Sequence, residues 1–510
     1  MKLMTTLADH AELIRALAHW LGEACGAPSA IIETHISSVI LVGRHAFKLK
    51  KPVDFGFVNF LSLADRKHFC EEELRLNGRM APSIYIDVAP VFGTPSTPRL
   101  SGDGEPIEYA VRMHRFEQRE LLDRLAESHG IAPVWIDDLA ERVAAFHGSI
   151  DHVDPAAPWG QPATVIGPVR ANFEHLGSLA LPQGRLDQVA RIAAWTEARI
   201  DALSPLLERR RREGWIRECH GDMHLGNMAL IGQEIEVFDG IEFNHELRWI
   251  DLQSDVAFLT MDLQHRNQAE LAWRFLNRYL ANTGDYAGMA LHAFYQTYRA
   301  MVRAKIDGLR ATDPSLPDAE RTRLQRDLGV LLDLAESFTR LRTPRLALTC
   351  GLSGSGKSTA ARRIAHREGC IQLRSDVERK RLHGLAARAD SRSDIGGGIY
   401  GPEASAATYA RLLDLTGQLL AADVSVIVDA AFLKRAQRTP FLELAAARGV
   451  AAEILWCDAD LDVLRERVTA RRGDASEATV EVLERQVASF EPPGAGEPFR
   501  RFPTDTPSVA

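Results

Sequence analysis

Three features are missing from the 510-residue sequence, and each absence excludes a class of protein. No run approaches the roughly 18–20 consecutive apolar residues that span a bilayer, and charged side chains interrupt the apolar positions near the N-terminus, as they would not in a signal peptide. None of the six cysteines stands in a Cys-x-x-Cys pair, which argues against a zinc knuckle or a redox pair. Basic residues show no excess, since the net charge is −8. We therefore expect a cytoplasmic protein with reduced thiols, whose partners include no membrane and, by default, no nucleic acid.

The length predicts two or three domains, at about 100–200 residues each. Residues 31–60 are rich in β-branched and aromatic side chains, with a hairpin expected at Gly43 and Arg44, and residues 62–80 switch to helical spacing. Helical patterns then dominate until a buried-type strand begins at Thr343. The predicted parts are a small mixed lobe over residues 1–115, a helical lobe over 116–340, a third domain over 341–490 and a loose, proline-rich tail over 491–510.

A glycine-rich stretch, Gly351 to Ser358, fits G-x-x-x-x-G-K-[ST] at every fixed position. An apolar strand precedes it and an alanine-rich helix follows it, which is the context that this phosphate-binding loop requires. Its backbone N–H groups would point at phosphate oxygens, and the helix N-terminus favours the negative charge. We expect Lys357 to meet the terminal phosphates of ATP and Ser358 to hold Mg²⁺. The predicted nucleotide-binding residues are Gly351, Ser353, Gly354, Ser355, Gly356, Lys357, Ser358 and Thr359.

Charged residues farther along the chain supply candidate partners for this loop. A buried-type strand ends at Asp429, where a carboxylate could orient Mg²⁺ or its water shell, or could simply cap the strand. Asp376 follows another strand and could take a proton from a substrate hydroxyl, with Arg379 and Arg381 holding the substrate. Arg467 and Arg471 could close over the transferring phosphoryl group. A solvated helix start and a plain surface helix are the alternative interpretations of these last segments.

A second motif, HGDMHLGN over residues 220–227, points to phosphoryl transfer by different residues. Asp222 precedes Asn227 by five positions, and Asp239 follows Asn227 by twelve. In such reactions one carboxylate accepts the proton of the substrate hydroxyl, while an asparagine and a second carboxylate hold Mg²⁺. Asp222, Asn227 and Asp239 fit these three roles in that order.

A lysine–glutamate pair would complete this second constellation by positioning the α- and β-phosphates. Lys48 lies on a predicted strand, and the helix after it offers either Glu73 or Glu72 as the partner. The two motif histidines, His220 and His224, raise the alternative of a zinc site. The glutamate expected beside the first histidine of a zinc-binding helix is missing, so we favour a role in fixing the loop.

Both halves resemble known families. Residues 30–300 resemble the aminoglycoside phosphotransferase and choline kinase-like superfamily through the residue 220–227 motif and Asp239, although no Gly-x-Gly-x-x-Gly loop is present. Residues 341–490 resemble small P-loop kinases of the gluconate kinase and zeta-toxin type through the glycine-rich loop and the Ser-Asp-x-x-Arg segment. Their order resembles a bacterial family of fused bifunctional proteins. The resemblance implies a multidomain α/β and α+β fold: a bilobal protein-kinase-like unit, then a P-loop NTPase with a parallel α/β/α sandwich.

The resemblance also implies that Asp251 and Asp255 are structural aspartates, and it leaves Glu242 as either a further Mg²⁺ ligand or a structural group. We expect an ATP- and Mg²⁺-dependent kinase with two heads that act on small-molecule hydroxyls. Two alternatives stay open: one head regulates the other, or the P-loop head phosphorylates polynucleotide 5′ ends. The sequence does not decide the acceptor, the choice between ATP and GTP, or the oligomeric state. Acidic residues that could line a groove for a cationic acceptor, or merely face solvent, are Asp251, Asp255, Asp262 and Glu270.

Overall fold

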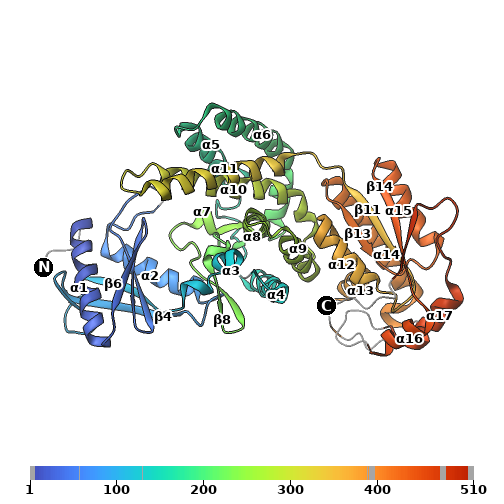
Figure 1. Cartoon of the computed structure of the whole chain (residues 1–510), viewed down its shortest axis with the longest axis horizontal. Helices are drawn as coiled ribbons and strands as arrows, with labels where there is room; N and C mark the ends of the chain where they lie inside the picture. The colour runs from blue at the N-terminus through green and yellow to red at the C-terminus, as the bar shows by residue number, and fades with distance from the viewer. Residues whose placement is uncertain are drawn as a thin grey trace. The chain divides into compact units, whose positions relative to one another are not determined.

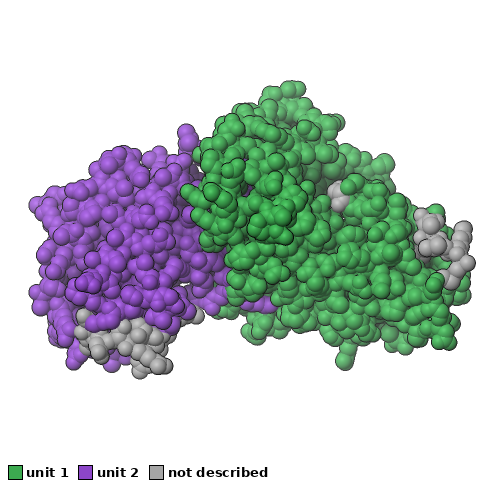
Figure 2. Space-filling view, turned by 180° about the vertical axis from the view of Figure 1, so that it is seen from behind, with its two compact units in different colours: residues 1–138, 145–262, 298–332 green, residues 139–144, 263–297, 333–510 purple. Residues whose placement is uncertain are grey.

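The computed structural model describes residues 6–56, 58–128, 130–387, 389, 397–470 and 478–503, without the side chain of Pro503. The chain forms two compact units, which Figure 2 distinguishes by colour. Unit 1 comprises residues 1–138, 145–262 and 298–332, and unit 2 comprises residues 139–144, 263–297 and 333–510. Within the described ranges, no helix has both the length and the apolar character needed to cross a membrane.

Unit 1 begins with a twisted antiparallel sheet in the strand order β1-β2-β3-β6-β4-β5 (Figure 1). The expected hairpin is confirmed: Val42 pairs with His45 across Gly43 and Arg44. Apolar residues of β2 and β3 pack with one face of α1 into a buried core. The elements are α1 (Leu7–Cys25), β1 (Ser29–Glu33), β2 (Ser37–Val42), β3 (His45–Lys50), α2 (Leu63–Asn77), β4 (Tyr85–Thr94), β5 (Thr97–Arg99) and β6 (Glu108–His114).

Helices and two short two-stranded antiparallel sheets follow, and they carry the residue 220–227 motif. The motif lies between β7 and β8, where η2 forms its last turn. The elements are η1 (Gln118–Glu120), α3 (Leu122–Ser128), α4 (Pro133–Ser149), α5 (Pro162–Ser178), α6 (Gln183–Arg212), β7 (Ile216–Glu218), η2 (Leu225–Asn227), β8 (Met228–Ile231), β9 (Glu234–Val237), α7 (His245–Arg248), β10 (Trp249–Asp251), α8 (Leu252–His265), α10 (Met289–Ala311) and α11 (Asp318–Thr339).

Unit 2 is built on a five-stranded parallel sheet in the order β12-β13-β11-β14-β15, with helices packed against it. The mixed order of the strands requires helical crossovers, which is the architecture of a P-loop domain. Its elements are α9 (Ala269–Thr283), η3 (Tyr286–Gly288), β11 (Arg345–Cys350), α12 (Lys357–Glu368), β12 (Ile371–Arg374), α13 (Ser375–Leu382), η4 (Gly398–Tyr400), α14 (Pro402–Ala421), β13 (Val426–Asp429), α15 (Arg435–Ala447), β14 (Ala451–Asp458), α16 (Leu461–Ala470), α17 (Val480–Ser489) and β15 (Phe499–Pro503).

Two features of the structure differ from the domain division predicted from the sequence. Unit 2 includes residues 263–297, which the sequence assigns to the helical lobe. The tail over residues 491–510 is not loose throughout, because β15 pairs with β14 along its length. The buried guanidinium of Arg438 also bonds Glu497 at 2.7 and 3.0 Å. Prolines misled the prediction, since an edge strand tolerates them.

Candidate active sites

In unit 1, buried side chains fix the backbone of the residue 220–227 loop. Asp255 of α8 accepts hydrogen bonds from the backbone N–H groups of His220 and Gly221, each at 2.9 Å. Arg299 of α10 donates to the carbonyl oxygen of Gly221 at 2.9 Å. Gly221 has a φ of 84°, and a Cβ there would lie 2.6 Å from a neighbouring backbone carbonyl oxygen, so the turn needs glycine.

This turn presents Asp222 beside Asn227. The Asn227 amide nitrogen donates to Asp222 Oδ2 at 2.8 Å and to the Asp222 carbonyl at 3.0 Å, which leaves the amide oxygen as the atom it can offer to a cation. His224 Nε2 lies 3.4 Å from Asp222 Oδ2. Burial acts to raise the pKa of Asp222, but His224 and Arg303 outweigh it and hold that pKa below its usual value. Asp222 is therefore an ionised carboxylate that can accept a proton.

The predicted lysine–glutamate pair forms, and Asp239 joins it. Lys48 of β3 donates to Glu73 Oε1 of α2 at 2.8 Å and to Asp239 Oδ1. Burial opposes the charge of Lys48, but the Asp239 and Glu73 carboxylates raise its pKa well above the ordinary value. Asp239 has a φ of 60°, a left-handed conformation that is uncommon outside glycine and concentrates at functional positions. Its side chain remains 46% exposed, so a carboxylate oxygen can reach a ligand.

A second lysine, which sequence reasoning missed, extends the pair into a buried network. Lys50 donates to Glu73 Oε2 at 2.8 Å and to Glu242 Oε1, and all three side chains are almost fully buried. Burial would raise the pKa of Glu73, but Lys48 and Lys50 lower it to about 2. Because the Glu242 carboxylate pairs with Lys50, this geometry supports a structural role for Glu242. Alternate strand residues share a face, so Lys50 could have been found from its spacing to Lys48.

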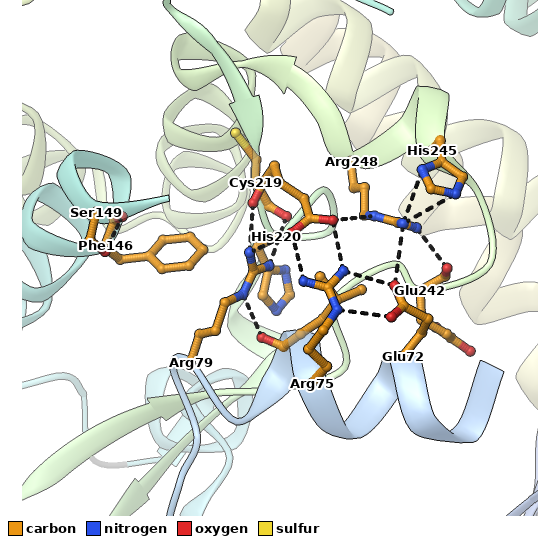
Figure 3. Close-up of polar contacts among 12 residues, drawn as sticks. Glu72, Arg75, Arg79, Phe146, Ser149, Cys219, His220, Glu242, His245 and Arg248 are labelled. Atoms are coloured by element: carbon orange, nitrogen blue, oxygen red, sulfur yellow. Dashed lines mark hydrogen bonds and ion pairs between the residues drawn. The ribbon is translucent and has the colours of Figure 1, made fainter. Parts of the chain in front are cut away.

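Glu72, the neighbour of Glu73, pairs with arginines. Glu72 bonds Arg75 at 2.8 Å and lies 3.5 Å from Arg248, as Figure 3 shows. Arg75, Arg79 and Arg248 also converge on Glu218, which ends β7 just before the residue 220–227 loop. This ion cluster fastens α2 to the strand that leads into the residue 220–227 loop. The open choice between the two glutamates is thus decided geometrically: Glu73 is the residue that contacts Lys48.

In unit 2, the glycine-rich loop connects β11 to α12, and two glycines are required by close approach. Gly351 has a φ of 143°, and a Cβ there would overlap the carbonyl oxygen of Cys457. Gly354 has a φ of 84°, and its Cβ would lie 2.8 Å from a carbonyl oxygen of α16. Ser358 Oγ donates to Asp429 Oδ1 at 3.1 Å, which brings together the two predicted Mg²⁺ residues. Lys357 Nζ donates to the carbonyl oxygen of Leu352 at 2.7 Å.

The other predicted residues of unit 2 surround this loop to different degrees. Asp376 lies in the first turn of α13, directly after β12. Arg467 is half-buried on α16, which packs apolar side chains against the loop. Arg471 lies outside the described residues. The remaining predicted nucleotide-binding residues, Ser353, Ser355, Gly356 and Thr359, lie in the loop and the first turn of α12.

The suggested groove of acidic residues is wrong for three of its four members. Asp251, Asp255 and Asp262 are buried, and each accepts hydrogen bonds inside the fold. Asp251 pairs with Arg210 at 2.7 and 2.8 Å, and Asp262 accepts from the backbone of η2 at 2.9 Å. These aspartates stabilise the fold around the residue 220–227 loop and do not line a groove.

The zinc alternative finds no support in the geometry of the two motif histidines. His220 Nε2 lies 3.0 Å from the carbonyl oxygen of Phe238, and His224 Nδ1 accepts from a backbone N–H at 3.1 Å. Among the residues that the structure describes, the one group close enough to share a metal is His147, Cys219 and Asp255. The Asp255 oxygens there accept backbone N–H groups, and burial raises the pKa of Cys219 well above its ordinary value, which disfavours the thiolate.

The fold and these two centres define the class of protein, a chain that joins a unit of antiparallel sheet and helices to a P-loop unit on a parallel sheet. Residues 346–493 match the model of a family described as AAA domain. The uncharacterized protein Rv2004c of Mycobacterium tuberculosis (strain ATCC 25618 / H37Rv) is 31% identical over 450 residues, which cover 88% of each chain. The match therefore extends over both units, and the chain belongs to the same family of fused proteins.

Two solved structures resemble the separate parts. A choline/ethanolamine kinase family protein from Mesorhizobium loti is 13% identical, covers 64% of this chain and 99% of that chain, and has a TM-score of 0.37. A gluconokinase from Sinorhizobium meliloti 1021 is 23% identical, covers 32% of this chain and 86% of that chain, and has a TM-score of 0.25.

Proposed function

We propose that the protein is an ATP- and Mg²⁺-dependent phosphotransferase with two active heads. Each head transfers the γ-phosphoryl group to a hydroxyl of a small molecule: a sugar, an aminoglycoside-like compound or another metabolite. The observation that carries the proposal is that each unit contains its own lysine for the phosphates and its own oxygen ligands of the kind that Mg²⁺ prefers.

In the head of unit 1, Lys48 holds the α- and β-phosphates and Glu73 keeps that lysine in place. Asp222 takes the proton of the acceptor hydroxyl as the oxygen attacks, a contribution worth about 10²–10⁴ in rate. The Asn227 amide oxygen and the Asp239 oxygen that Lys48 does not engage would hold Mg²⁺. Bound there, Mg²⁺ neutralises charge on the phosphates.

In the head of unit 2, the loop N–H groups and the N-terminus of α12 receive the phosphates. Lys357 leaves the carbonyl oxygen of Leu352 and moves to the terminal phosphates when nucleotide binds. Ser358 would be a ligand of Mg²⁺, and Asp429 would orient the metal or its water shell. Asp376 is the proposed base, and Arg467 and Arg471 are the proposed cations over the transferring group.

A metabolite-library screen with γ-labelled ATP tests this function on wild type, Lys357→Ala and Asp222→Ala. We expect each variant to lose a different set of labelled products and to keep the other set. If one variant loses every product and the other loses none, the head that carries the second substitution makes no product and is a regulator. If the products lost in Lys357→Ala are labelled oligonucleotide ends, the P-loop head is an end kinase, a partner that the acidic net charge disfavours.

A further inference from the structure

Helix α9 lies inside the range that the sequence assigns to the helical lobe, yet it packs against α12 and β12 of unit 2 (Figure 1). Gly369, which ends α12 with a φ of 73°, permits this approach, because a Cβ there would lie 3.0 Å from the indole of Trp273 on α9. α9 is joined in sequence to α8 and, through η3, to α10, which carry Asp255 and Arg299 of the unit 1 loop.

Asn277 is the polar contact at the centre of this packing. Its Oδ1 accepts from the backbone N–H of Gln372 on β12 at 2.7 Å. Its Nδ2 donates to the carbonyl oxygen of Cys370 at 2.9 Å and to that of Trp273, one turn back on α9, at 2.9 Å. Asn277 is 8% exposed, and its amide bonds the backbone of β12 on the side opposite β13. Asn277 therefore fixes the backbone position of Gln372.

Gln372 carries this restraint to the predicted Mg²⁺ site. Its Nε2 donates to Asp429 Oδ2 at 2.9 Å, and it lies 3.4 Å from the carbonyl oxygen of Ser358. Asp429 Oδ1 accepts from Ser358 Oγ at 3.1 Å. A continuous hydrogen-bonded series thus runs from α9 through β12 to the carboxylate and hydroxyl that would serve the metal. Such buried networks hold their members in one geometry.

The segment formed by α9 and η3 also contacts α13, the helix whose first turn carries the proposed base. Arg381 of α13 donates to the carbonyl oxygen of Ala281 at 2.6 Å, and its guanidinium lies 5.9 Å from the ring centre of Tyr286. Arg381 pairs with the buried Glu378 on its own helix. α13 begins with Asp376, the proposed base, so both attachments of the segment lead to functional residues of unit 2.

We propose that Asn277 is a positioning residue of the P-loop head, which acts through Gln372 to aim the Asp429 carboxylate at the Mg²⁺–nucleotide complex. The site of the P-loop head is then complete only with a helix that precedes the P-loop domain in sequence. This inference rests on the proposed nucleotide-binding function of unit 2.

The test measures the affinity for ATP by calorimetry on the full chain, once with saturating Mg²⁺ and once in EDTA. The binding event that disappears in Lys357→Ala is assigned to the P-loop site. Its readout is the gain in affinity that Mg²⁺ confers. We expect Asn277→Ala to reduce this gain about fivefold, the effect of one hydrogen bond, and to leave the affinity in EDTA unchanged. Asn282 is a matched control, because it also bonds a carbonyl one turn back on α9 but is exposed. Asn282→Ala should change neither affinity.

A double-mutant cycle separates positioning from general packing. Gln372→Ala should reduce the gain at least as much as Asn277→Ala, and the double variant should be no worse than Gln372→Ala alone. Additive losses, or an equal fall in Mg²⁺ and in EDTA, would overturn the inference. Asn277→Ser, which is also too short to reach β12, serves the same test if the alanine variant does not fold. If Lys357→Ala removes no ATP-binding site, the proposed function of unit 2 fails instead, which is a distinct result.

Discussion

The centre of unit 1 is assembled from charged side chains far apart in sequence, whereas the centre of unit 2 is mainly eight consecutive residues. Lys48, Glu73 and Asp239 meet across as many as 191 positions. The loop from Gly351 to Ser358 instead depends on backbone conformation and close packing. One site is therefore vulnerable where a buried charge loses its partner, and the other where a glycine gains a side chain.

The two centres are also separate in the residues that form them. Neither centre borrows a predicted phosphate-binding or Mg²⁺-binding residue from the other unit, since the residues around Asp222 lie in unit 1 and those around Lys357 lie in unit 2. The chain passes between the two units within helices α4, α8, α10 and α11. Substitutions should therefore act on one head at a time, and their rank should follow the physics of that head.

The largest expected effect is on catalysis in unit 1. Asp222→Ala should lower phosphoryl transfer to the unit 1 acceptor by about 10²–10⁴, because the carboxylate that accepts the proton is gone. The rate of product formation under saturating ATP measures this loss. The exposed Asp201→Ala is the control and should retain the wild-type rate. A loss below tenfold in Asp222→Ala would assign the base elsewhere.

The next effect compares two adjacent glutamates. Glu73→Gln leaves Lys48 and Lys50 buried without a full counter-charge and should cost about 3 kcal/mol of unfolding free energy together with most unit 1 activity. Glu72→Gln removes a partly exposed partner and should cost about 1 kcal/mol or less. Denaturant unfolding followed by far-UV circular dichroism measures both. Equal costs for the two variants would contradict the assignment of Glu73 to the lysines.

A smaller effect is expected from a single methyl group in the P-loop. Gly354→Ala forces a Cβ against α16 at a left-handed φ and should weaken ATP binding by the P-loop head about tenfold. Gly384→Ala is a matched control, since its φ is 70° but no atom of the residues that the structure describes lies within 4 Å of the added carbon. Equilibrium binding of ATP reports the difference. Similar losses in both variants would mean that backbone strain alone, and not the contact with α16, sets the requirement.

The effect that is smallest at neutral pH, and grows only on acidification, is a pH dependence of stability in unit 1. Burial of His10 lowers its pKa from 6.5 to about 4, so the unfolded chain binds the proton first. The resulting stability is present above pH 6.5 and is lost as the pH falls toward 4, by at most about 3 kcal/mol. His10→Gln should flatten this part of the curve, whereas His19→Gln, on the exposed side of the same helix, should not. An unchanged slope in His10→Gln would contradict this origin.

Local patterns were the predictable part of the molecule. The bond between Ser358 and Asp429 follows from a motif and a strand end, and the bond between Asp222 and Asn227 follows from a spacing of five. The Lys48 partner stayed open between Glu72 and Glu73, because neighbouring helix positions point to different neighbours and only tertiary packing selects one.

Packing between distant segments was the part that could not be predicted. Asn277 belongs to no motif. The amphipathic pattern of its helix predicts a buried face, but it does not predict which element covers that face. The spacing of Lys50 from Lys48 placed both on one face of the strand, but the burial of Lys50 could not be predicted, because a charged strand residue is normally solvated. Only the packing of Glu242 and Glu73 gives it buried partners. The strand at Phe499 was hidden by the prolines around it.

The stoichiometry of ATP binding to the full chain in the presence of Mg²⁺ tests the central claim most directly, because it needs no acceptor. We predict two ATP molecules bound per wild-type chain, one in Lys357→Ala, one in Lys48→Ala and none in the double variant. A single ATP per wild-type chain, or the loss of both by one substitution, would contradict two separate nucleotide-binding heads.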